Sequence, residues 1–121
     1  MTLPVFDRAV LDRLSAQARG HGDDGLVAEV LEDALGSIEH CCADLTRSLA
    51  ARDLARLRSV AHRLKSVLRQ MGAMRMGEEA AETERLALAE SEEAFHRASA
   101  TLTLREATTA ALSAHLAALR G

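Results

Sequence analysis

A histidine near the middle of the chain is surrounded by cationic residues at helical spacings. Relative to His62, the neighbours at positions −4, +3, +4 and +7 are Arg58, Lys65, Ser66 and Arg69. Side chains three, four or seven residues apart share one face of an α-helix. An exposed imidazole is largely a free base at neutral pH, so it can attack an electrophile. Because positioned cations stabilise the charge on a transferring phosphoryl group, this face is suited to phosphoryl chemistry.

The same stretch has an apolar face that would hold it against a protein core. On a helix with about 100° per residue, its apolar residues fall on one side: Ala61, Leu64, Leu68 and Met71. His62 then points roughly 140° away from the middle of this stripe, so we expect its imidazole to be exposed. From spacing alone, a solvated helix face that happens to carry one His and several Arg explains the pattern equally well.

The composition favours helices over sheets. Ala, Leu, Arg and Glu are abundant among the 121 residues, which include one Pro, no Trp or Tyr and only two Phe. These preferences are typical of helical proteins, so we expect an all-α chain. A chain of this length is expected to form one domain that buries about two thirds of the surface its unfolded form exposes.

Charge, hydropathy and cysteine content indicate which partners and which cellular compartment suit the chain. The formal net charge of −3 argues against a general nucleic-acid binder. No apolar run approaches the roughly 20 residues needed to span a bilayer, and the first four residues do not resemble a signal peptide. Cys41 and Cys42 are neighbours that would diverge on a helix, so they are poorly placed to bridge each other. We expect a soluble cytoplasmic protein that binds neither nucleic acid nor membrane.

Recurring apolar residues predict an antiparallel four-helix bundle with a short additional N-terminal helix. The short helix covers about residues 7–18, with Asp7 as its N-cap, and the bundle covers about residues 24–119. The four bundle helices are expected at about 24–50, at about 54–71, from a break at Gly72 or Gly77 to about 90, and from about 91 to 119. Only Arg52 and Asp53 connect the first two, so these helices should be antiparallel neighbours.

Two features of the predicted stripes are unusual. The fourth helix of the chain offers only a weak stripe of small or polar inward residues: Met76, Ala80, Thr83 and Ala87. The stripe of the last helix is interrupted by Arg105 and Thr109, so its middle is less well suited to burial. Asp24 is the expected N-cap of the first long helix.

The central motif resembles a known family signature. Ala61-His62-x-Leu64-Lys65-Ser66, followed by Gly72-Ala73, resembles the signature of histidine-containing phosphotransfer (HPt) domains of bacterial two-component phosphorelays. Similar segments also occur elsewhere in the chain: Phe6-Asp7, Leu31-Glu32-Asp33 and Leu49-Ala50-Ala51-Arg52-Asp53. The resemblance covers nearly the whole chain and is strongest over residues 24–84. Glu79 and Thr83 depart from it, because the family usually has Leu at both positions.

The resemblance implies a role for each residue of the motif. His62 would be the phosphorylated residue, which takes a phosphoryl group from a receiver-domain aspartate and passes it to another. Lys65 would help to neutralise the phosphate, and Gly72 would allow tight packing near the site. Gln70 occupies a position where the family often has Asn or Gln and would help to orient the site by hydrogen bonding.

The resemblance also implies the partners. A response-regulator receiver domain would dock on the His62 face, and a sensor or hybrid histidine kinase would stand upstream. Arg58 and Arg69 would meet acidic groups of the partner, while the small Ser66 leaves a bulky partner room to approach. The chain would hold no cofactor, because magnesium would come with the receiver's acidic pocket. It would carry the phosphoryl group without autonomous catalysis. The alternative is a helical adaptor that binds a receiver or kinase without being phosphorylated.

Other potentially reactive residues are expected to be structural. His40 beside Cys41 and Cys42 lacks a second pair at ligand spacing, so a metal site is disfavoured. The remaining histidines are expected at solvent-exposed or rim positions: His21, His96 and His115. The acidic residues of the fourth helix are expected to form a solvated face: Glu78, Glu79, Glu82 and Glu84. A metalloprotein, and a hydrolase built on Ser66 and His62, are the weaker alternatives.

Overall fold

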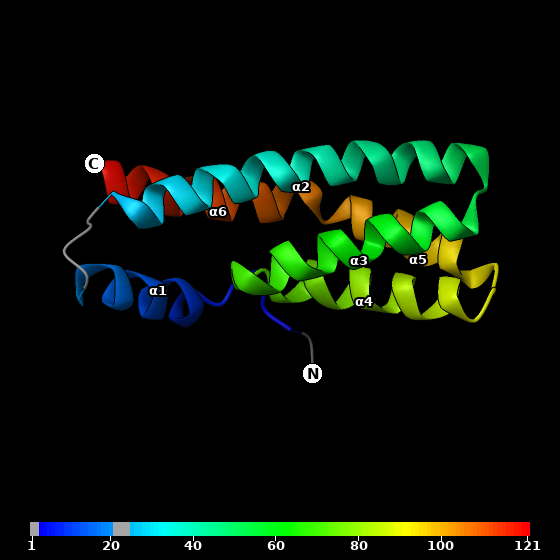
Figure 1. Cartoon of the computed structure of the whole chain (residues 1–121), viewed down its shortest axis with the longest axis horizontal. Helices are drawn as coiled ribbons and strands as arrows, with labels where there is room; N and C mark the ends of the chain where they lie inside the picture. Colours follow the sequence, from blue (N-terminus) through cyan, green and yellow to red (C-terminus); the bar gives the residue numbers. More distant parts are fainter. Residues whose placement is uncertain (1–2, 21–24) are drawn as a thin grey trace.

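The computed structural model describes residues 3–20 and 25–121, and these form helices joined by turns, without a strand in the described part. The helices are α1 (Arg8–Gly20), α2 (Leu26–Ala51), α3 (Leu54–Gln70), α4 (Met74–Leu88), α5 (Glu93–Thr103) and α6 (Arg105–Arg120). The predicted all-α class is confirmed. In the bundle, α2, α3 and α4 run antiparallel in turn, and α5 with α6 together form the fourth rod (Figure 1).

The turn between α2 and α3 is as short as the sequence predicted. Arg52 adopts a left-handed conformation with φ of 50°, which reverses the chain. The carboxylate of Asp53 accepts a hydrogen bond from the backbone N–H of Arg56 at 3.1 Å, so Asp53 caps α3 as expected. At the other end of α2, Gly25 occupies the N-cap position without a side-chain cap, and Asp24 lies outside the described residues.

The last predicted helix is two helices, which corrects the expectation of one run over about 91–119. α5 ends at Thr103 and α6 begins at Arg105, with Leu104 between them. Two threonine hydroxyls near this point donate to backbone carbonyls: Thr101 to Arg97 at 2.8 Å and Thr103 to Ala100 at 2.7 Å. Such bonds compete with the regular helical ladder and favour a break. The predicted stripe is buried at Phe95, Ala98 and Leu112, whereas Leu119 is exposed.

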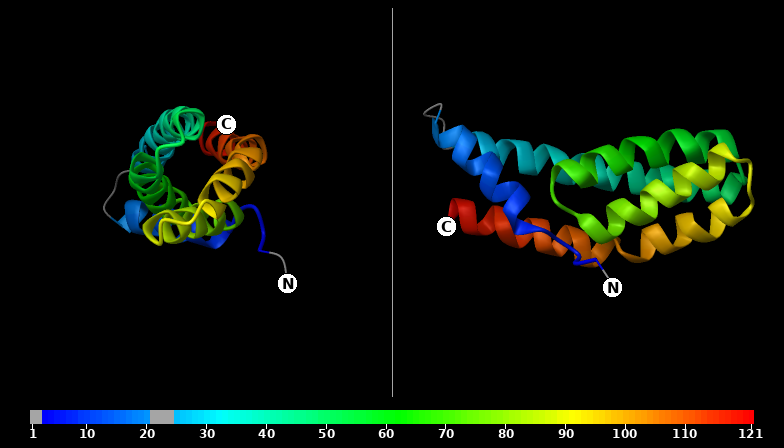
Figure 2. Two further views of the ribbon diagram at one scale, coloured as in Figure 1. Left: turned by 90° about the vertical axis from the view of Figure 1, so that its right-hand side faces the viewer. Right: turned by 90° about the horizontal axis from the view of Figure 1, so that it is seen from below.

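α1 completes one end of the bundle. With 26 residues, α2 is longer than α3 with 17, so α2 and α6 extend beyond the α3–α4 pair, and α1 lies against this extension (Figure 2). Leu11 of α1 is fully buried, and the Phe6 ring meets the His115 ring of α6 edge-on at 5.8 Å. Asp7 accepts a hydrogen bond from Ala9 N–H at 3.0 Å, which confirms its capping role.

The turn between α3 and α4 is hydrogen-bonded to the N-terminal segment and packs closely against it. Gly72, which breaks the helix as predicted, has φ of +78°, and a Cβ built on it would lie 2.5 Å from the carbonyl oxygen of Asp7. The Asp7 N–H donates to the Gly72 carbonyl at 2.7 Å. Close packing is therefore present at Gly72, but its partners are Asp7, just before α1, and Val10 of α1. Ten residues separate Gly72 from His62, which corresponds to about 15 Å along a helix axis.

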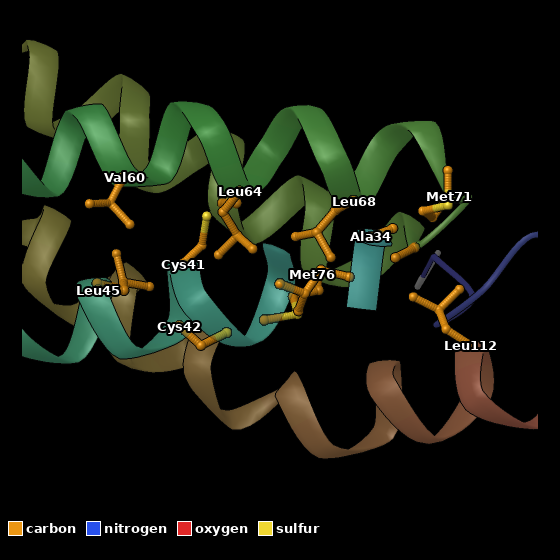
Figure 3. Close-up of a cluster of buried hydrophobic side chains, with 14 of the residues drawn as sticks. Ala34, Cys41, Cys42, Leu45, Val60, Leu64, Leu68, Met71, Met76 and Leu112 are labelled. Carbon is orange, nitrogen blue, oxygen red and sulfur yellow. The ribbon is translucent and has the colours of Figure 1, made fainter. Parts of the chain in front are cut away.

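The core lies between the inward faces of all four rods. Val60, Leu64 and Leu68 of α3 point across the bundle toward the buried residues of α2 (Figure 3). Cys41 and Cys42 are buried free thiols. Burial raises the pKa of Cys42 to about 11, so this thiol stays protonated and behaves as a small apolar group.

The two positions in α4 that depart from the family pattern make polar contacts with α5. Thr83 is fully buried, and its hydroxyl lies 3.3 Å from that of Thr101. Glu79 forms an ion pair with Arg97 at 3.2 Å. The unusual residues are therefore accommodated by polar pairs between α4 and α5 in place of apolar packing.

Candidate functional site

α3 buries one face and displays His62 on the other. Leu57, Ala61 and Leu64 are fully buried, while the His62 side chain is 61% exposed. The exposed side chain confirms the predicted display of the imidazole, which follows from the helical period.

The side chain that contacts His62 most closely comes from α4. His62 Nδ1 is hydrogen-bonded to Oε2 of Glu84, and Lys65 Nζ donates to Oε1 of the same carboxylate at 2.5 Å. Glu84 and Lys65 are largely buried, with 19% and 20% of their side chains exposed. One carboxylate therefore joins the two motif residues that lie three positions apart on α3.

The charge state of Glu84 determines which nitrogen of His62 is free. Burial alone would raise the pKa of Glu84, but the hydrogen bonds from Lys65 and His62 outweigh it and lower this pKa below its ordinary value. At neutral pH the group is a carboxylate, which only accepts hydrogen bonds. Nδ1 must therefore carry the proton, and in the neutral ring Nε2 keeps its lone pair.

Glu84 corrects the prediction of a solvated acidic face on α4. The prediction agrees better with the other three acidic residues of α4, because each forms an ion pair at the surface: Glu78 with Arg69, Glu79 with Arg97 and Glu82 with Arg85. Glu84 instead borders the buried stripe, one position after Thr83 and four after Ala80. The sequence shows this position next to the stripe, but the contact with His62 can be inferred only when the packing of α4 against α3 is known.

The cations of the α3 face differ in their partners. Arg69 lies 3.8 Å from Glu78, and Arg63 lies 3.6 Å from Asp44 of α2. The side-chain hydrogen bond from Arg47 outweighs desolvation and lowers the pKa of Asp44, so this group is also anionic. Arg58 is exposed and forms no ion pair or side-chain hydrogen bond within the described part of the chain.

The two polar residues predicted near the site are both exposed on α3. The Ser66 hydroxyl donates to the His62 carbonyl at 3.1 Å, so it faces its own helix. The Gln70 side chain makes no hydrogen bond among the described residues, and it lies in the groove that also contains His62. An orienting role for Gln70 stays a prediction, while the observed contact to the imidazole comes from Glu84.

Two hollows flank His62. The first, which we call the α2–α3 groove, is lined by Gly36, Ser37, His40, Cys41, His62, Arg63, Ser66, Val67 and Gln70. The second, which we call the α3–α4 hollow, is lined by Ala55, Arg58, Ser59, His62, Arg63 and Glu84. The imidazole is thus accessible from both sides of α3.

Neither a metal site nor a membrane span is found in residues 3–20 and 25–121. No group of three or more His, Cys, Asp or Glu side chains there is placed to hold a metal ion, and His40 lies 3.4 Å from Asp44 instead. No described helix is both long and apolar enough to cross a bilayer. His96 is exposed as expected, whereas His115 is partly buried with its Nε2 enclosed, and His21 lies outside the described residues.

Comparison with known proteins assigns the family. The profile of the Hpt domain family matches residues 29–121, which run from the first turn of α2 through α6 and include the whole His62 site. The chain belongs to the Hpt domain family, the histidine phosphotransfer domains of two-component phosphorelays. Neither the curated proteins nor the solved structures yielded a match to the chain. The predicted recognition and helical fold are both confirmed.

Proposed function

We propose that this chain carries a phosphoryl group on Nε2 of His62 between aspartates of response-regulator receiver domains. The observation that carries the proposal is the bond between Glu84 and His62 Nδ1, because it leaves the other ring nitrogen unprotonated on an exposed side chain. Membership in the Hpt family supports phosphoryl transfer in general, and the geometry supports this particular residue and atom.

The transfer step balances without a further reactant. The Nε2 lone pair attacks phosphorus of an aspartyl phosphate, the bond from phosphorus to the aspartyl oxygen breaks, and the carboxylate leaves. The Nδ1 proton stays on the ring, so the product is a phosphoimidazolium next to the Glu84 carboxylate. A fixed negative charge beside the ring stabilises the positive charge that develops there. The reverse step returns the phosphoryl group to a second aspartate.

Lys65 adds positive charge on the same face while it holds Glu84 in place. In this proposal it contributes to neutralising the phosphate, as the family resemblance implies. The chain contributes no cofactor, and the receiver's acidic pocket supplies magnesium and much of the catalysis. A sensor or hybrid histidine kinase phosphorylates that receiver in the cytoplasm.

The α2–α3 groove is the proposed docking surface for the receiver. Small residues border it at Gly36 and Ser37, and Val67 and Cys41 add apolar surface. A Cβ placed on Gly36 would meet nothing within 4 Å, so the groove is open at this point. Ser66 and Gln70 complete the contact surface. Arg69, next to Gln70 on α3, would exchange Glu78 for an acidic group of the partner.

The test is transfer of labelled phosphate from a phosphorylated receiver domain. We expect the wild-type chain to acquire an acid-labile, base-stable phosphate and the His62→Gln variant to acquire none. His96→Gln is the matched control, because His96 is an exposed histidine on α5 outside both hollows. Normal labelling of His62→Gln would refute the proposal. Receiver binding without any labelling, and indifferent to loss of the imidazole, would instead identify an adaptor.

A further inference from the structure

Among the cations that surround His62, Arg58 alone is without a partner in the part of the chain that the structure describes. Lys65 is bound to Glu84, Arg63 faces Asp44 and Arg69 faces Glu78. A phosphoryl group arriving on the imidazole brings negative charge to this face. The paired cations would have to share or leave an existing carboxylate to bind it, whereas Arg58 would not.

Helix geometry also places Arg58 on the turn that the His62 side chain covers. Side chains on an α-helix lean toward its N-terminus, so a residue covers the surface of the turn that precedes it. For His62 this preceding turn contains Arg58 and Ser59, at positions −4 and −3. Lys65 and Ser66 lie on the turn that follows.

The α3–α4 hollow joins these residues in one space. Arg58 and Ser59 line it together with His62, and Glu84 forms its wall on the α4 side. Since Nδ1 is held by Glu84, Nε2 is the ring nitrogen left to carry a phosphoryl group, and Arg58 lines the same hollow as this ring. An arginine suits such a position because its planar fork can bind two phosphoryl oxygens at once.

We propose that Arg58 binds the phosphoryl oxygens on His62 directly. The inference rests on the proposed function for the origin of the phosphoryl group, but not for the contact itself. Lys65 contributes charge to the same face while it holds Glu84 against the imidazole, and Arg58 adds the unpaired cation.

The experiment uses phosphoramidate, which phosphorylates exposed imidazoles with release of ammonia and needs no protein partner. The full chain is labelled, and the phosphorus signal of His62 is identified by its loss in His62→Gln. The signal is then titrated with pH by ³¹P NMR. An adjacent guanidinium favours the dianionic phosphoryl form, so Arg58→Ala should raise the apparent pKa of the phosphoryl group by about 0.2–0.7, the range for an exposed ion pair.

Two matched variants separate a direct contact from a general charge effect. Arg56→Ala removes another exposed cation of α3 that does not line the hollow, and it should leave the titration unchanged. Arg58→Lys keeps a positive charge, so it should raise the apparent pKa of the phosphoryl group less than Arg58→Ala does. Equal titration curves for wild type, Arg58→Ala and Arg56→Ala would overturn the inference, as would equal shifts in both alanine variants. If these shifts occur as expected but no receiver donates phosphate, the contact stands and the proposed function fails.

Discussion

His62 and Glu84 are 22 residues apart in the sequence, and their side chains are in direct hydrogen-bonded contact between α3 and α4. Glu84 accepts a hydrogen bond from Nδ1 of the imidazole with one carboxylate oxygen and binds Lys65 with the other. The reactive histidine is therefore held by a residue outside its own helix. Its tautomer depends on how α4 packs against α3.

Removal of the Glu84 carboxylate should slow phosphoryl transfer. A hydrogen bond to a charged group contributes about 1.5–3 kcal/mol, and about 1.4 kcal/mol corresponds to a factor of ten in rate, so Glu84→Ala should lose roughly 10- to 100-fold. Glu84→Gln can still accept a bond from Nδ1 and should lose less. Single-turnover transfer from a phosphorylated receiver measures both variants.

Glu82→Gln is the matched control, because Glu82 is on the same helix and pairs with Arg85 at the surface. Its transfer rate should equal that of wild type. If Glu84→Ala also transfers at the wild-type rate, Glu84 does not control the ring nitrogen that reacts.

The helical bundle and the display of His62 were predictable because both follow from local periodicity. Leu57, Ala61 and Leu64 recur with the helical repeat, and this repeat alone directs His62 away from the core. Glu84 was not predictable in this way. Its contact with His62 depends on the register of α4 against α3, which no local pattern specifies.

The break between α5 and α6 also could not be predicted from the periodic pattern of apolar residues. The sequence showed an interrupted stripe at Arg105 and Thr109, but the break falls at Leu104, where threonine hydroxyls compete for backbone carbonyls. Similarly, burial of the ring nitrogen of His115 arises because the segment around Phe6 folds back onto α6. Contacts between distant segments account for each difference.

Lys65→Ala should weaken the site through Glu84 as well as through the phosphate. Without the ammonium group, the largely buried carboxylate loses one of its two side-chain partners. We expect slower transfer or a shorter phosphohistidine lifetime, with the helical circular dichroism unchanged. Lys65→Ala and Glu84→Gln should combine with less than additive loss in a double-mutant cycle, because both act on one contact. Strictly additive losses, or kinetics unchanged by Lys65→Ala, would contradict this.

The Glu84 interaction should make stability depend on pH in the acidic range. Because the folded-state pKa of Glu84 is lowered, the stabilisation is present above the ordinary glutamate pKa of about 4.3 and is lost as pH falls through the lower, folded value. The difference in unfolding free energy between wild type and Glu84→Gln should therefore be constant above about pH 5 and shrink below about pH 4. Urea unfolding across this range measures it; a difference that grows on acidification would have the wrong sign.

Gly72 should be intolerant of a side chain. Gly72→Ala places a Cβ 2.5 Å from the Asp7 carbonyl at φ of +78°, so we expect a loss of about 1–3 kcal/mol, visible as a lower Tm. Gly36→Ala is the control, because a Cβ there meets nothing within 4 Å and alanine is favoured in a helix by up to about 1 kcal/mol. A Gly72→Ala protein as stable as wild type would show that the N-terminal segment can move away without cost.

A bulky cation in the α2–α3 groove should block the receiver without affecting the histidine. Ser37→Arg adds a long charged side chain to the groove wall, while Ala43→Arg adds the same group to an exposed position of α2 that faces another surface. The long side chain occupies the groove and holds the receiver away from His62, so Ser37→Arg should weaken receiver binding at least about tenfold, and Ala43→Arg should not.

Chemical labelling by phosphoramidate needs no docking, so it should proceed equally in both arginine variants. This second readout separates loss of docking from loss of reactivity at His62. Slower labelling of Ser37→Arg would mean that the substitution disturbs the imidazole itself. Equal receiver binding by Ser37→Arg, Ala43→Arg and wild type would place the docking surface elsewhere, with the α3–α4 hollow as the remaining approach to His62.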